Sequence, residues 1–142
     1  MSRNSILTIA LACCFAAGAF WLGRTTAQER KMSRLYELRT YTTLEGRLPA
    51  LEKRFKDDTC RLFEKHGIKN GMYWIPTDPK LKDNTLIYVV SHDSQEAADK
   101  SWKAFQADPE WIKVRDASEA DGKIVSEVKR VYMTLADWSP VK

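Results

Sequence analysis

The stretch Leu86–Val90 limits the possible folds more than any other, because it reads Leu-Ile-Tyr-Val-Val and holds no charged residue. It lies within Thr85–His92, whose β-branched and aromatic residues predict a strand. Successive side chains of a strand point to opposite faces, so a strand that is apolar throughout needs cover on both faces. A sheet with helices on one face only would leave the other face of this strand open to water.

The remaining periodicity predicts an α+β fold. Further strands are expected at Leu35–Thr43, Lys69–Ile75 and Ile124–Leu135. Apolar residues at three- and four-residue steps predict a helix over Leu48–Lys65, with Gly67 just past its end. The order of strand, helix, strand, strand, helix pair and strand is that of a ferredoxin-like βαββαβ unit, an antiparallel sheet with helices on one face.

The helix pair has a well-marked joint. Ser94 is expected to cap the first helix of the pair, and Asp108 the second, which should run to about Asp121. Pro109 has the ring angle of a first helical position, where no N–H donor is needed. Glu110 then falls in the positive first turn of the new helix.

The predicted sheet has an apolar face that its own helices cannot cover. An exposed apolar patch of this size usually marks an interaction surface. A second copy packed sheet to sheet would cover it, so we expect a homodimer.

The N-terminus predicts a targeting segment. Arg3 is followed by the uncharged apolar run Ile6–Leu22, and small residues up to Ala27 suit a signal peptidase. Residues 1–27 are therefore interpreted as a signal peptide or an N-terminal membrane anchor, residues 28–34 as a linker and residues 35–140 as one folded domain. The protein is expected to be exported, periplasmic or extracellular, or to be held at the membrane by this segment alone.

Charge and cysteine content argue against several kinds of partner and site. The chain has 23 Lys and Arg against 19 Asp and Glu, without a basic block, so nucleic acid is not an expected partner. After the leader a single cysteine remains, Cys60, which cannot form an intramolecular disulfide. Two histidines and this cysteine at unrelated spacings predict no metal site, and no glycine-rich phosphate loop appears. No cofactor is expected, and a haem held by His66 would rest on that one histidine.

A few polar and aromatic residues are candidates for chemistry. His66 and His92 could act as a general base near neutral pH, with Arg39 beside them. Each also has a structural interpretation: His66 stabilises a helix end, His92 is a solvated turn residue, and Arg39 pairs with Glu127 or Glu37. Candidates for lining a ligand pocket, which could equally be core residues, are Tyr41, Tyr73 and Trp102.

Several short motifs resemble those of the NIPSNAP family. They are Tyr36-Glu37-Leu38-Arg39-Thr40-Tyr41, His66-Gly67, Gly71 with Trp74, Phe105-Gln106-Ala107-Asp108-Pro109-Glu110-Trp111, and Ser139-Pro140. The Asp-Pro-Glu-Trp string is the most specific of them. The resemblance spans residues 35–140 and implies a dimeric α+β barrel and roles in protein association and trafficking, without a defined reaction.

Two hypotheses from different classes follow. The first is a non-catalytic dimeric module that binds a small apolar ligand or a protein partner. The second is a cofactor-independent enzyme, monooxygenase- or isomerase-like, acting on a small aromatic compound in a pocket beside the sheet. A cavity of a few hundred Å³ onto which Arg39 and a histidine converge would favour the enzyme.

Overall fold

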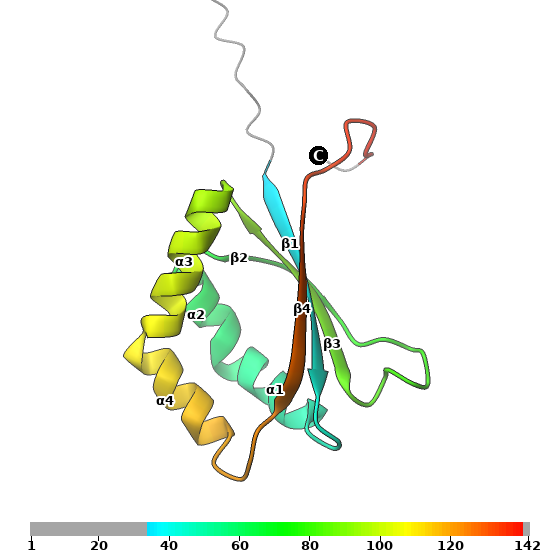
Figure 1. Cartoon of the computed structure of the whole chain (residues 1–142), viewed down its shortest axis with the longest axis vertical. Helices are drawn as coiled ribbons and strands as arrows, with labels where there is room; N and C mark the ends of the chain where they lie inside the picture. The colour runs from blue at the N-terminus through cyan, green and yellow to red at the C-terminus, as the bar shows by residue number, and fades with distance from the viewer. Residues whose placement is uncertain (1–33, 141–142) are drawn as a thin grey trace, which may run out of the picture. The chain divides into compact units, whose positions relative to one another are not determined.

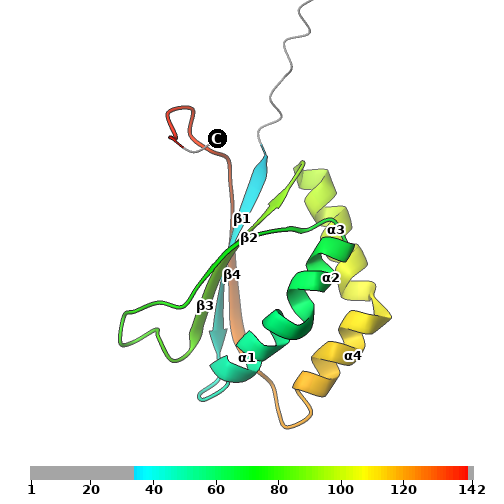
Figure 2. The same cartoon turned by 180° about the vertical axis from the view of Figure 1, so that it is seen from behind.

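A computed structural model of the chain describes residues 34–140, and its four strands form one antiparallel sheet (Figure 1). The strands lie in the order β2-β3-β1-β4. Their bounds are β1 Leu35–Thr43, β2 Lys69–Trp74, β3 Thr85–His92 and β4 Val125–Met133. The helices lie along one face of this sheet in both views (Figures 1 and 2). The predicted βαββαβ order and fold class are confirmed, whereas the expected leader lies outside the described residues.

The first predicted helix is one continuous run with a π-helical centre. It consists of α1 (Leu48–Arg54), the π-helical segment η1 (Phe55–Thr59) and α2 (Cys60–Lys65). Thr59 stabilises the wider turn, because its hydroxyl donates to the backbone oxygen of Arg54 at 3.1 Å. Single π-helical turns inside α-helices are frequent at functional sites.

The helix pair forms around the predicted caps. In α3 (Gln95–Ala107) the Ser94 hydroxyl accepts from the Ala97 N–H at 3.1 Å, and in α4 (Pro109–Ser118) the Asp108 carboxylate accepts from the Glu110 N–H at 2.8 Å.

Helix α4 ends at Ser118 rather than near Asp121, and Arg47 supplies the physical reason. Its guanidinium binds the Asp121 carboxylate at 2.7 Å and the Gly122 backbone oxygen at 3.0 Å. These contacts draw the chain out of the helix. Strand β4 is likewise shorter than predicted at both ends, and β2 ends one residue earlier than predicted, at Trp74.

Aromatic side chains fill the space between sheet and helices. Phe63 lies at the centre, with ring centroids 5.0 Å from Phe105, 5.2 Å from Trp102 and 6.1 Å from Tyr88. The pairs with Phe105 and Trp102 are edge-to-face, and such pairs contribute about 0.5–1.5 kcal/mol each beyond their burial. The core therefore depends on a few large rings that fix α2 and α3 against β3.

The opposite face of the sheet carries an apolar patch, here called the outer patch. It consists of Tyr36, Leu38, Trp74, Ile87, Val89, Val131 and Met133, which the strand register places on one face. Val131 is 54% exposed and Trp74 43%. No helix of residues 34–140 covers this face, and none of them is long and apolar enough to cross a membrane.

Candidate functional site

Glu37 is the centre of a buried polar network on the helix-facing side of β1. Its side chain is fully buried, and both carboxylate oxygens accept hydrogen bonds. Arg39 Nη1 donates to Oε1 at 3.1 Å. Trp102 Nε1 donates to Oε2 at 2.6 Å, and His92 Nε2 lies 3.0 Å from the same oxygen. We call these four residues the Glu37 network.

Burial alone would raise the pKa of Glu37. The hydrogen bond from His92, the positive charge of Arg39 and the hydrogen bond from Trp102 act in the opposite direction, and together they hold this pKa below its ordinary value. The carboxyl group is therefore ionised at neutral pH. A carboxylate only accepts hydrogen bonds, so the His92 proton lies on Nε2.

Arg39 connects β1 to helix α3. Its guanidinium carbon lies 4.1 Å from the centroid of the Trp102 ring and 5.5 Å from that of Tyr41. Of the two acids considered as its partner, Glu37 is confirmed and Glu127 is not, since Glu127 pairs with Lys129 at 3.3 Å.

The prediction that His92 is a solvated turn residue is wrong. His92 is only 1% exposed, because β3 keeps its alternation to the last residue and places the ring on the helix-facing side. Its Nδ1 is buried without a hydrogen-bond partner among the described residues. His92 thus joins Arg39 and Trp102, as an active site would require, but inside a closed network.

A pocket of about 350 Å³ opens between the sheet and the helices, and we call it the sheet–helix pocket. Its aromatic lining residues are Tyr41, Phe55, Phe63, Phe105 and Trp111. Its charged lining residues are Arg54, Arg115, Glu119, Lys123 and Glu127. Both η1 termini, Phe55 and Thr59, contribute to the wall, so the π-helical turn shapes this pocket. Of the predicted ligand-pocket residues, Tyr41 lies here.

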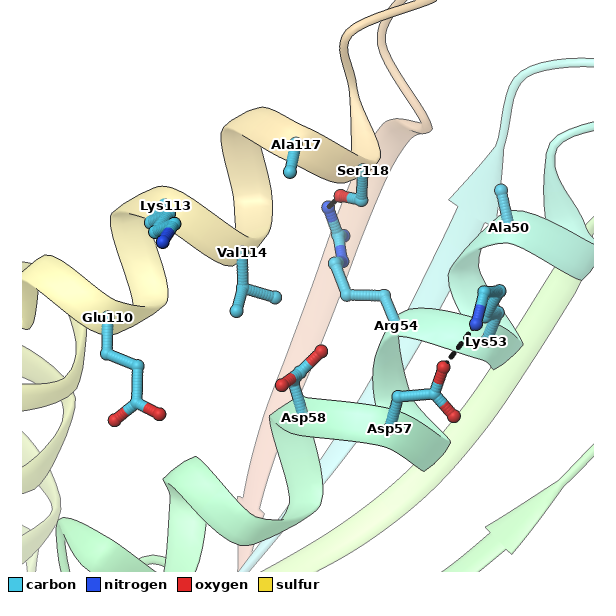
Figure 3. Close-up of a pocket in the computed structure, with 10 residues that line it drawn as sticks. All are labelled: Ala50, Lys53, Arg54, Asp57, Asp58, Glu110, Lys113, Val114, Ala117 and Ser118. Carbon is cyan, nitrogen blue, oxygen red and sulfur yellow. Dashed lines mark hydrogen bonds and ion pairs between the residues drawn. The ribbon is translucent and has the colours of Figure 1, made fainter.

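A wider groove of about 530 Å³ lies between the first helical run and α4 (Figure 3). Its charged lining residues include Lys53, Asp57, Asp58, Glu110 and Lys113. Arg54 reaches from α1 to α4 across it, and Nη1 donates to the Ser118 hydroxyl at 3.1 Å (Figure 3). Arg54 is also the residue that this groove and the sheet–helix pocket share, so its side chain separates the two.

His66 lies apart from the Glu37 network. Its Nε2 is 2.6 Å from the Asp108 carboxylate, which also pairs with Lys65 at 2.8 Å. The hydrogen bonds from Lys65 and His66 and from the Glu110 N–H lower the pKa of Asp108 far below its usual range. Glu110 in turn binds Arg61 at 2.7 Å. His66 therefore secures the α3–α4 joint to the end of α2.

Tyr73 is also separate from the sheet–helix pocket. Its ring stacks on Tyr88, with centroids 5.3 Å apart, and its hydroxyl donates to Asn70. Burial raises the pKa of Tyr73 strongly, so the phenol stays protonated. Among residues 34–140, no cluster of metal-binding side chains is found.

The sequence analysis did not identify Glu37 as the common hydrogen-bond acceptor of the network. It also did not identify Arg54 or Trp111 as pocket-lining residues. The position of Glu37 could have been predicted, because residues two apart on a strand lie on the same face of the sheet, and Glu37 precedes Arg39 by two. The position of Arg54 could not, because it depends on how α4 packs against α1.

Comparison with known proteins places this architecture in a family. The NIPSNAP family model matches residues 36–140. No curated protein matches the chain.

Three solved structures illustrate the structural similarity. A NIPSNAP family protein of unknown function from Agrobacterium tumefaciens is 20% identical, with a TM-score of 0.67 over 79% of this chain and 96% of that one. SnoaB, a cofactor-independent oxygenase from Streptomyces nogalater, is 14% identical, with a TM-score of 0.52 over 78% and 99%. A monooxygenase from the gene ActVA-Orf6 of Streptomyces coelicolor, in complex with Nanaomycin D, is 14% identical, with a TM-score of 0.53 over 82% and 99%. At these identities the likeness concerns the fold, that of a protomer of the dimeric α+β barrel proteins.

Proposed function

The chain belongs to the NIPSNAP family, and from that premise we propose that it is a homodimeric binding domain that holds a small apolar molecule in the sheet–helix pocket. The observation that carries the proposal is the pocket itself, because about 350 Å³ lined by five aromatic rings is the size and character of a ligand site. Binding without catalysis is favoured, because neither of the two histidine candidates for a general base lines this pocket. His92 does not line it, and His66 is engaged by Asp108.

The outer patch supports the dimer. Leu38 pairs with Val89 and Val131 on its two neighbouring strands, so the apolar surface continues across three strands. Met72 and Trp138, 62% and 83% exposed, lie beside it, because both line one cavity with Tyr36, Val89 and Met133 of the patch. A second copy packed on this face would remove these side chains from water at about 25 cal/mol for each Å² of apolar surface covered.

The predicted leader supports a location outside the cytoplasm. A chain with the apolar run Ile6–Leu22 before a linker is expected to be exported, or tethered by that segment with the domain outside the bilayer. The partner or ligand would then be met outside the cytoplasm.

Native mass spectrometry of the purified chain tests the two main parts of the proposal. We expect twice the monomer mass and a retained or exchangeable small molecule. Val128→Trp, at a half-exposed position that lines the sheet–helix pocket, should fill the pocket and abolish ligand retention without changing the subunit number. Retention of the ligand by this variant would place the binding site elsewhere.

A cofactor-independent oxygenase or isomerase is the second candidate. It is favoured by the fold shared with SnoaB and with the ActVA-Orf6 monooxygenase, and by the Glu37–His92 pair. Its test is oxygen uptake with an electron-rich hydroquinone. Acceleration over buffer that is lost in His92→Gln would support the enzyme, whereas equal rates with and without protein would exclude this reaction.

A further inference from the structure

Arg54 is an unusual residue to find in the wall of an apolar pocket. Its side chain is only 5% exposed, yet Nε is buried without a hydrogen-bond partner among the described residues. Its two hydrogen bonds, to the Ser118 hydroxyl at 3.1 Å and to Glu119 Oε1 at 3.3 Å, both use Nη1. Within residues 34–140, the edge formed by Nε and Nη2 is therefore free of protein acceptors. This edge is one of those that bind a carboxylate through two parallel hydrogen bonds.

The charges around the pocket leave one cation unbalanced. Arg115 pairs with Asp116 at 2.8 Å, and Glu127 pairs with Lys129 at 3.3 Å. Glu119 pairs with Arg54 at 3.3 Å, and its Oε1 also accepts from the Ile124 N–H at 3.2 Å. Lys123, at the rim, has no ion-pair partner within residues 34–140. A ligand that carries one negative charge would balance this excess.

The apolar walls specify the rest of the ligand. Trp111 packs against Phe105 with ring centroids 4.5 Å apart and the planes tilted by 33°, and the guanidinium carbon of Arg54 lies 5.4 Å from the centroid of the Trp111 ring. A flat ring held against Trp111 would therefore bring a substituent to Arg54. We propose that the ligand of the sheet–helix pocket is a planar aromatic acid whose carboxylate binds Arg54, an inference that rests on the proposed binding function.

Two fluorescent probes with the same ring system test it on the purified chain. Anilinonaphthalene sulfonate carries the anion, and N-phenylnaphthylamine lacks it. The charged probe should bind more tightly although it is the less apolar of the two. Naphthoate should displace it, and naphthamide at the same concentration should not. This comparison needs no substitution, so it does not depend on how a variant folds.

Substitutions then locate the interaction. Arg54→Gln should weaken binding of the sulfonate about tenfold, the effect of losing a hydrogen-bonded charge, and leave the neutral probe within about twofold. Lys113→Gln is the matched control, because it removes an exposed cation of α4 that lines the groove between the first helical run and α4 and not the sheet–helix pocket. It should change neither affinity.

The outcomes separate the inference from its premise. Equal affinity for both probes, equal competition by naphthoate and naphthamide, or an equal loss of both probes in Arg54→Gln would overturn the aromatic acid while the pocket still binds. If neither probe binds, or if Val128→Trp leaves binding of both unchanged, the proposed pocket function itself fails.

Discussion

Replacing Glu37 by Gln, which keeps the side-chain shape, should destabilise the domain strongly. The glutamine retains one acceptor oxygen, but its amide group would face a donor, and the buried guanidinium of Arg39 would lose its counter-charge. Removing one partner of a buried ion pair costs about 3–5 kcal/mol. The remaining acceptor keeps some of the hydrogen bonds from His92 and Trp102, so we expect about 3 kcal/mol.

Urea denaturation followed by tryptophan fluorescence measures this loss at equal protomer concentrations. A domain of this size has a denaturant dependence of about 1.5–2 kcal/mol per molar urea, so the midpoint should fall by about 1.5–2 M. Glu127→Gln is the matched control, because it makes the same exchange on β4 in an ion pair whose side chains are 54% and 71% exposed. Exposed pairs contribute about 0–1 kcal/mol.

The pH dependence gives the same experiment a second readout. The folded-state pKa of Glu37 lies below its ordinary value near 4.5. The stabilisation is therefore complete above that value and is lost as the pH falls through it toward the folded-state pKa. The difference between wild type and Glu37→Gln should shrink in acid. If the midpoints of Glu37→Gln and Glu127→Gln coincide at neutral pH, the Glu37 network does not stabilise the fold as argued.

Three further predictions concern separate parts of the chain. Sedimentation of the Gln28–Lys142 fragment at micromolar concentration should give twice the monomer mass, and Val131→Glu on the outer patch should give the monomer; a monomeric wild type would contradict the dimer. Asp108→Asn should retain the helix cap and lose only the ion pairs, so its thermal midpoint should lie between those of wild type and Asp108→Ala at neutral pH. The gap to wild type should close as the pH falls below the ordinary pKa of Asp108 near 3.8 toward its lowered folded-state pKa. Intact-mass measurement of the exported protein should show cleavage after Ala27, and a retained leader would instead identify an anchor.

Local patterns were sufficient for most of the fold. The bounds of β1 and β3 agree with the sequence prediction residue for residue, because both segments are bordered by turn-forming or capping residues. The α3–α4 joint was equally predictable, since Asp108 and Pro109 meet the demands of a cap and of a first helical position at once.

The π-helical segment could not be predicted in this way. Its apolar positions fit an ordinary helix, and the wider turn depends on where Phe55 meets the aromatic core. The Thr59 hydroxyl that bonds to the Arg54 carbonyl is a feature that many α-helices share without widening. Sequence periodicity therefore predicts that the helix exists, but not its local pitch.

His92 shows where local reasoning misleads. The residues that follow it, Asp93 and Ser94, are those of a turn, and a histidine beside them looks solvated. Its burial is decided by Glu37, 55 positions away, and by Trp102 on the helix that the turn introduces. No window of sequence contains both partners, so the Glu37 network emerges only from the packed sheet.

The same network bears on the choice between binding and catalysis. His92 Nε2 donates its proton to a carboxylate, and the one nitrogen that could accept a proton, Nδ1, is enclosed by protein. To act as a base on a molecule in the sheet–helix pocket, the ring would have to leave both Glu37 and the Trp102 packing. That motion would remove the hydrogen bond from His92 to the buried Glu37 carboxylate, at a cost of about 1–3 kcal/mol. Arg54, by contrast, lines the pocket itself, and its Nε has no acceptor among residues 34–140, so an anion bound there would leave the Glu37 network intact.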